Sequence, residues 1–273
     1  MMSTLRYSCV AAFVVLTGLA GTASAQSGYG STPAVGEKYV LEIAGGLWNP
    51  NPELVVSSSS LGIAGSDVDF VRDLGAEKQT LKEFRATLKL GRRNKFFVRY
   101  TPMEYVQESV LERRIVFNGT TYDVGLPVNS TLEWRAWRFG YELDIIARDR
   151  GFLGVVAEAK YTQVSASIDS PLLSEATEAR APIPALGAIA RVYPLANLGI
   201  TGEFTAFKLP GSIAERENAS GYYYEWDFNG VLNFTRNFGV QGGYRWLDVS
   251  FVRDLDFGDL RIGGPYALGI VRF

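Results

Sequence analysis

The sequence predicts an all-β fold: a closed, up-and-down antiparallel transmembrane β-barrel of about ten strands, with eight possible. Three observations predict it. Apolar and polar side chains alternate over many segments of about ten residues. The turns between these segments are alternately short and long. The final segment is amphipathic and ends in phenylalanine. Short turns on one side and long loops on the other are typical of barrels that span a membrane.

Residues 81–90 (LKEFRATLKL) show the alternation that defines each strand. Phe84 and Leu88 point to one face, and Glu83 and Arg85 point to the other, because successive side chains of a strand face opposite ways. The same alternation predicts ten strands, over residues 38–48, 80–90, 95–106, 132–147, 152–167, 183–193, 198–208, 222–234, 239–251 and 260–273.

The connections place these strands in a membrane. If the N-terminus lies in the periplasm, every short turn falls on the periplasmic side and every long loop falls outside. Within one long loop, Asn118-Gly119 predicts a β-hairpin that rises above the membrane. The short turns lie near residues 91–95, 148–151, 194–197 and 235–237, and the long loops near 49–80, 107–131, 169–182, 210–221 and 253–259.

The N-terminus predicts export. Residues 1–25 combine a basic Arg6, a short apolar stretch and an Ala23-Ser24-Ala25 cleavage site, so we expect a signal peptide over 1–25 and a barrel domain over 26–273. The only cysteine, Cys9, lies in the apolar stretch, so the mature domain has no disulfide. No mature segment approaches 18 uninterrupted apolar residues, which argues against membrane-spanning helices.

Alternation alone does not say which face points inward, since a soluble lipocalin-like carrier would turn its apolar face inside. Two features favour a membrane. Aromatic residues such as Trp137, Trp226 and Trp246 cluster near strand ends on the apolar face, as in the aromatic girdles of membrane barrels. The same face carries small residues such as Gly202 and Gly230, where a packed core would favour bulk.

The polar face is then expected to line the lumen. Both signs of charge are mixed there, and ten strands lie near the size at which side chains fill a barrel. Two states of the lumen remain open: closure by interlocking ion pairs, or a narrow and weakly selective channel. The predicted lumen residues are Glu83, Arg85, Lys89, Arg99, Arg138, Glu142, Asp144, Glu158, Lys160, Arg191, Glu203, Glu225, Asp227, Arg245 and Arg272.

The hairpin GRRNKFFVRYTP (91–102), the stretch VDFVRDLG (68–75) and the terminal Phe273 resemble the small outer-membrane β-barrels of the OmpA/OmpW-like superfamily, over about residues 38–273. The resemblance implies a monomeric barrel in the outer membrane of a Gram-negative cell, in contact with its lipid and lipopolysaccharide. It also implies that Phe273 is a sorting signal read by the outer-membrane assembly machinery. Ten strands depart from the usual eight of those families.

Composition restricts the chemistry. The sequence has no histidine, so a Ser-His-Asp triad and histidine metal sites are impossible. Outer-membrane barrels that are enzymes rely on a histidine as base or relay, so we predict no enzyme, no catalytic residues, no cofactor and no metal site. A formal net charge of −2 gives no basic footprint for nucleic acid.

A short repeated segment suggests a contact across the barrel seam, where the first and last strands meet. FVRDL occurs at 70–74 and again at 251–255. Closure of the barrel would bring these segments together, so Arg72–Asp254 and Arg253–Asp73 are hypothetical ion pairs, although chance explains the repeat equally well. Three functions remain: a structural protein or narrow small-solute channel, a surface-binding or adhesion barrel that acts through its long loops, and a soluble periplasmic lipocalin-like carrier.

Overall fold

The computed structural model describes residues 34–57, 66–69, 73, 78–171, 173–216, 218–253 and 256–273. Residues 1–25, Arg72 and Asp254 lie outside the described residues, as does the side chain of Arg253, so the signal peptide and the seam ion pairs stay predictions. Asp73 is described, and its carboxylate accepts a hydrogen bond of 2.6 Å from Arg113.

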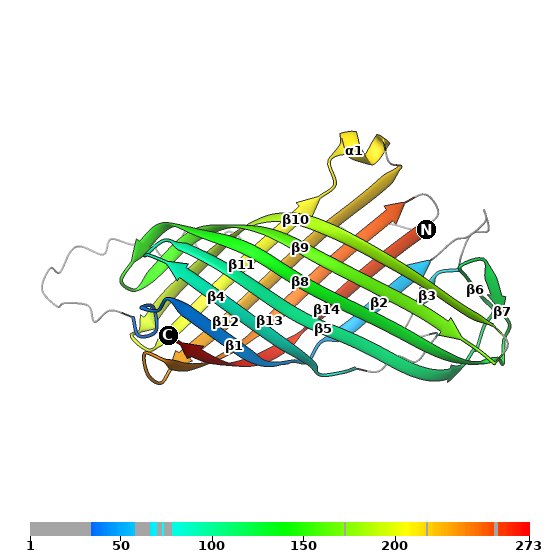
Figure 1. The fold of residues 1–273 in the computed structure, drawn as a ribbon, viewed down its shortest axis with the longest axis horizontal. Coiled ribbons are helices and arrows are strands. Elements are labelled where there is room, and N and C mark those ends of the chain that lie inside the picture. Colours follow the sequence, from blue (N-terminus) through cyan, green and yellow to red (C-terminus); the bar gives the residue numbers. More distant parts are fainter. Residues whose placement is uncertain are drawn as a thin grey trace, which may run out of the picture. The chain divides into compact units, whose positions relative to one another are not determined.

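A closed antiparallel barrel forms the compact unit that comprises Pro33–Phe273, which confirms the predicted fold class (Figure 1). Each long strand pairs with the next along the chain, and pairing of the first with the last closes the barrel. The ten barrel strands are β1 (Leu41–Trp48), β4 (Leu81–Leu90), β5 (Asn94–Val110), β8 (Pro127–Arg148), β9 (Gly151–Asp169), β10 (Ser174–Leu195), β11 (Leu198–Lys208), β12 (Ala219–Asn233), β13 (Phe238–Arg253) and β14 (Asp256–Arg272).

Shorter elements gather at one end of the barrel, which we call the hairpin end; the opposite end, with the short connections, is the short-turn end (Figure 1). No helix in the described part of the chain is long and apolar enough to cross a membrane. The short elements are β2 (Asn51–Ser57), which extends the sheet beside β14, β3 (Val68–Asp69), the hairpin of β6 (Ile115–Phe117) and β7 (Thr120–Tyr122), and the helix α1 (Gly211–Arg216).

Several strands run further toward the hairpin end than the sequence predicted. The segments 127–131 and 174–182, expected in loops, belong to β8 and β10, and they pair continuously with β9. Their sequences carry polar residues on both faces, so the apolar alternation that marks a strand is missing. The predicted long loops at 107–131 and 169–182 are therefore wrong over much of their length.

The predicted hairpin at Asn118-Gly119 is confirmed. Both residues adopt left-handed conformations, with φ of 48° and 82°, as a two-residue hairpin turn of the favoured kind requires. The hairpin packs back onto the barrel instead of projecting freely. Ile115, Phe117 and Tyr122 are fully buried, and the Tyr122 hydroxyl donates a 2.9 Å hydrogen bond to the Ile168 carbonyl.

The two faces of the sheet differ in the half of the barrel near the short turns. On β9, Leu153, Val155 and Tyr161 are exposed on the outer face, whereas Glu158 and Lys160 are buried inside. A membrane barrel has this arrangement, with apolar residues on the outside and charged residues on the inside. The arrangement is inconsistent with the lipocalin-like alternative, which needs an apolar interior at this level.

The apolar outer face ends at a row of aromatic residues. Tyr100, Trp137 and Tyr161 are neighbours in register on β5, β8 and β9, and the rings of Tyr100 and Trp137 stack at 4.2 Å. One step further toward the hairpin end, the outer face carries Arg135 beside Gln163. The barrel wall therefore continues beyond the apolar belt with a polar exterior.

This boundary predicts a large loss of stability for one arginine substitution on the outer face of β9 and almost none for another. Val155→Arg places a charge in the apolar belt and is expected to cost about 2–4 kcal/mol of unfolding free energy. Ser165→Arg lies beyond the aromatic row, between Glu133 and Glu178 in register, and is expected to change stability by less than about 0.5 kcal/mol. Equilibrium urea unfolding in lipid vesicles measures both, and equal losses would contradict the position of the belt.

Candidate functional site

The middle of the lumen is crossed by ion pairs that join strands that are not adjacent in the barrel. Arg99 on β5 forms two hydrogen bonds, of 2.9 and 2.7 Å, to the carboxylate of Glu203 on β11. Arg245 on β13 donates to Glu83 on β4 at 2.8 and 3.1 Å. These two-pronged arginine–carboxylate contacts are the strongest kind of charged hydrogen bond.

Glu225 is the hub of this network. Its carboxylate accepts hydrogen bonds from Arg138, from Lys160 at 2.8 Å and from the Tyr223 hydroxyl at 2.5 Å. Arg245 Nε lies 3.4 Å from the same carboxylate. Strands β8, β9, β12 and β13 thus meet at one side chain in the lumen.

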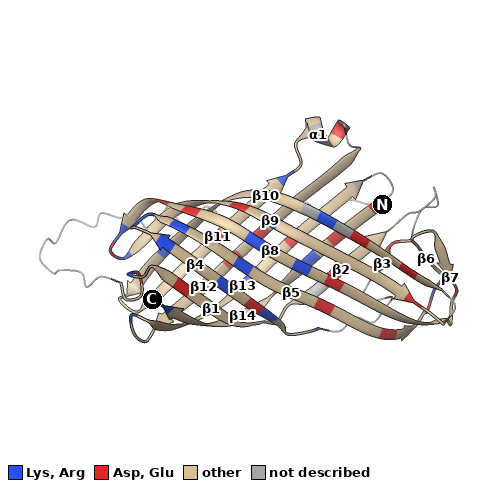
Figure 2. Cartoon of the chain, viewed as in Figure 1, with Lys and Arg blue, Asp and Glu red and all other residues tan. Residues whose placement is uncertain are grey.

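We call the ten charged side chains at this level the central ion layer. Each has between 0 and 11% of its side chain exposed. A buried charge is tolerable only when it is paired, and here the signs balance at five against five. The layer comprises the cations Arg85, Arg99, Arg138, Lys160 and Arg245 and the acids Glu83, Glu158, Glu203, Glu225 and Asp227. Figure 2 shows the two signs interspersed along the barrel strands.

The other five predicted lumen residues lie nearer the short-turn end. Glu142 and Asp144 share Lys95, at 2.6 and 3.0 Å. Arg272 Nε pairs with Glu42 at 2.6 Å. Lys89 and Arg191 both pair with Glu37, at 2.9 and 3.1 Å. The structure thus brings the predicted residues together in two layers of the same lumen.

Residues 34–40 form an N-terminal strap across the short-turn end. The backbone N–H groups of Ala34 and Val35 donate to the carbonyls of Asp149 and Ala196, which lie in two different short turns. Deeper in the lumen, the Glu37 carboxylate binds Lys89 and Arg191 and accepts a hydrogen bond from the Tyr193 hydroxyl. The strap therefore lies across this end and places one acidic side chain in the lumen.

The strap makes a close approach at one glycine. Gly36 has a φ of +85°, and a Cβ there would lie 2.7 Å from Arg272 Nη1. The Val35 carbonyl accepts a hydrogen bond of 2.7 Å from the Asn233 side chain. A residue without a side chain therefore lets the strap pass beside two polar groups of the lumen.

Sequence reasoning missed several lumen residues. Lys95 and Tyr223 share the parity of the predicted inward residues Arg99 and Glu225, so strict alternation could have found them. Glu37 gave no such signal, because it precedes the first strand and has no alternating neighbours.

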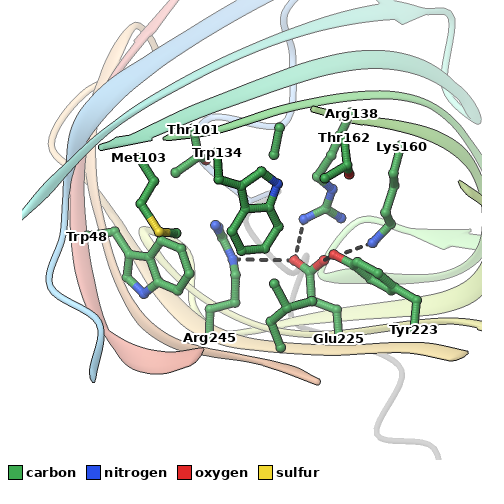
Figure 3. Close-up of a pocket in the computed structure, with 12 residues that line it drawn as sticks. Trp48, Thr101, Met103, Trp134, Arg138, Lys160, Thr162, Tyr223, Glu225 and Arg245 are labelled. Atoms are coloured by element: carbon green, nitrogen blue, oxygen red, sulfur yellow. Dashed lines mark hydrogen bonds and ion pairs between the residues drawn. The ribbon is translucent and has the colours of Figure 1, made fainter. Parts of the chain in front are cut away.

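Apolar side chains pack together inside the hairpin end. Met103, Leu132 and Trp134 on the inner faces of β5 and β8 pack with the buried side chains of the β6–β7 hairpin in one cluster. Ion pairs cross the surface above it, where Arg113 binds Asp73. Between this apolar core and the central ion layer lies a cavity of ≈ 40 Å³ (Figure 3).

The terminal residue takes part in barrel closure. The N–H of Phe273 donates to the Leu41 carbonyl at 2.8 Å, and the Phe273 carbonyl accepts from Val40 and Leu41. About two thirds of the residue is exposed (66%), so the ring is accessible on the outer face. Its proposed reading by the assembly machinery stays a prediction.

The strand order, the apolar belt and the charged lumen define a β-barrel of the outer-membrane type. No family model matches the chain, and no curated protein matches it in sequence. The more specific likeness to OmpA/OmpW-like barrels therefore has no support from a family model.

Comparison with solved structures finds barrels of this type. The outer membrane protease OmpT of Escherichia coli aligns with a TM-score of 0.59 and 9% identity, over 89% of this chain and 99% of its own. The attachment invasion locus protein Ail of Yersinia pestis aligns at 0.36 and 13%, over 85% and 96%. Neisserial surface protein A aligns at 0.34 and 14%, over 85% and 97%. At 9% identity the first likeness shows a shared fold and carries no activity with it.

Two arginines on β8 provide a matched test of the buried network. Arg138→Met removes one partner of Glu158 and Glu225 inside the lumen and is expected to cost about 3–5 kcal/mol of unfolding free energy, because it leaves the buried layer with five acids against four cations. Arg135→Met breaks only the exposed 3.0 Å pair with Glu133 and is expected to cost less than about 1 kcal/mol.

Urea unfolding of both variants in the same lipid vesicles measures the difference. Similar small losses for both would mean that water reaches the central ion layer and screens it.

Proposed function

We propose that this chain is an integral outer-membrane protein of a Gram-negative cell whose barrel is a sealed scaffold, and that it displays the hairpin end at the cell surface. The observation that carries the proposal is the central ion layer, in which ten buried charged side chains form ion pairs and several of these pairs cross the lumen. Ten strands are close to the size at which side chains fill a barrel, so little space is left for a water column.

Two further barriers support a closed lumen. The N-terminal strap occupies the short-turn end through Glu37, and the apolar core with the β6–β7 hairpin occupies the hairpin end. An ion crossing the barrel would have to displace the strap, separate buried ion pairs and pass through apolar packing. Each step removes favourable contacts or hydration, so the narrow-channel alternative is disfavoured.

The orientation follows from the two ends. In outer-membrane barrels the short turns face the periplasm and the longer structure faces outward. Here β8 and β9 continue beyond the aromatic row toward the hairpin end, and the outer faces of these extensions are polar. This favours display of the hairpin end in water outside the cell.

A free strand edge supports surface binding as a second candidate function. β10 pairs with β9 from Ser174 onward, but its pairing with β11 begins only at Leu186. Within the described residues, no strand pairs with the other edge of 174–185. A strand edge with unpaired backbone groups can accept an extended segment of a partner protein. Pro182 and Pro184 lack N–H groups, so residues 174–181 are the better part of this edge.

The sealed lumen predicts electrical silence. The refolded chain in a planar bilayer is expected to show no discrete conductance steps, provided that boiled and unboiled samples migrate differently and so confirm the folded barrel. A variant that lacks residues 112–125 should also be silent, because the central ion layer remains; the ends of this deletion are adjacent, since Leu111 donates to the Leu126 carbonyl at 3.1 Å. Reproducible conductance steps from the unaltered chain would contradict the proposal of a sealed barrel.

The proposed orientation predicts a difference between two single cysteines. Glu178→Cys lies on β10 at the hairpin end, and Asp149→Cys lies in a short turn; both native side chains are well exposed, at 42% and 61%. On intact cells, a membrane-impermeant maleimide is expected to label the first variant and to spare the second until the outer membrane is permeabilised. The reverse pattern would place the hairpin end in the periplasm, and labelling of both would argue against membrane insertion.

A further inference from the structure

The cavity above the central ion layer has two kinds of wall. Figure 3 shows Trp48, Met103 and Trp134 gathered on one side, and the ion-paired Arg138 and Glu225 on the other. The remaining lining residues include apolar Ala136 and Leu247 and the small polar Thr101 and Thr162. Apolar side chains that stand opposite a few placed polar groups are the kind of lining that binds small molecules.

One polar group in this wall has no partner. The Trp134 residue is 93% buried (7% exposed), and its indole N–H donates to no acceptor in the described part of the chain. The neighbouring Trp48 differs, because its N–H donates to the Gly264 carbonyl at 3.1 Å. Buried indole N–H groups normally find an acceptor, so the Trp134 N–H is available to a bound molecule.

A second unpartnered group lies one position further along the same inner face. Met103 pairs in register with Trp134, and Tyr105 follows Met103 on the inward side of β5. Tyr105 is 3% exposed, and within the described residues its hydroxyl has no hydrogen-bond partner. Tyr105 and Trp134 therefore lie at neighbouring positions of the same inner face, and of the two only Trp134 lines the cavity.

The polar wall does not favour a charged molecule. Glu225 pairs with Lys160, Arg138 and Arg245, and other acids of the central ion layer neutralise the remaining positive charge, so the layer holds five cations against five acids. With no surplus charge to compensate it, an ion entering the cavity would lose hydration without gaining a partner.

We propose that this cavity is a binding site for a small neutral molecule with an apolar body and one hydrogen-bond acceptor, which accepts from Trp134 Nε1. The cavity of ≈ 40 Å³ exceeds the roughly 10–15 Å³ that one water requires, so a compact molecule of a few heavy atoms is the appropriate size. Met103 lines the site, and its flexible, polarisable side chain adjusts to the shape of such a guest. The site goes beyond the proposed scaffold and does not depend on it.

The test uses cyclopentanone as the neutral probe and cyclopentanecarboxylate as the charged control. The full mature chain, labelled with ¹⁵N at tryptophan and folded in micelles, gives one indole N–H signal for each tryptophan; Trp134→Phe identifies the signal of Trp134. Cyclopentanone is expected to shift that signal saturably, whereas the carboxylate leaves it in place. Thr101→Phe fills the cavity and is expected to weaken the apparent affinity by about tenfold or more, while Leu153→Phe, on the outer face, leaves it unchanged.

Ala136→Leu replaces Thr101→Phe if the latter does not fold, since Ala136 lines the same cavity. Two results would overturn the proposal. One is a Trp134 signal that drifts without saturation, in parallel with the signal of the outer-face Trp137, because this would indicate partition into the micelle. The other is a saturable shift with the carboxylate at equal or lower concentration, which would show that the site selects an anion.

Discussion

A charge buried inside a narrow barrel has to be neutralised by an opposite charge within reach, and the rest of this structure depends on that constraint. The outer face of the belt is apolar, so the polar half of each alternating strand turns inward. Ten strands bring those side chains within reach of one another. The long arginine and glutamate side chains then meet in the middle, as Arg99 and Glu203 do, and the lumen fills with matched pairs.

The surroundings of the outer face explain why the interior changes from charged to apolar along the barrel. Within the belt, the outer face must be apolar, and the interior carries the charge. Beyond the aromatic row, the outer face meets water, and the interior becomes apolar around Met103 and Trp134. The proposed ligand site lies where these two interiors meet, so it has both an apolar wall and a polar one. A purely charged or purely apolar lumen would offer no such boundary.

Most of the fold could be predicted from the sequence, because strict alternation identifies a strand wherever one face is apolar. Residues 152–167 were predicted for β9, which spans Gly151–Asp169. The prediction fell short on β10, where residues 174–182 are polar on both faces and resemble a loop. The lumen residues could be listed from parity, but their partners could not. Glu83 and Arg245 are separated by 162 positions, and only the closed barrel brings them together.

The N-terminal strap has a consequence for the order of events during folding. Its partners lie on strands that are made much later in the chain: Arg191 and Tyr193 on β10, and the Ala196 carbonyl in the following turn. Residues 34–40 are among the first of the barrel domain to be synthesised, yet they can take their final place only after β10 and β11 have assembled. The strap is therefore in its final position only when the later strands are already in theirs.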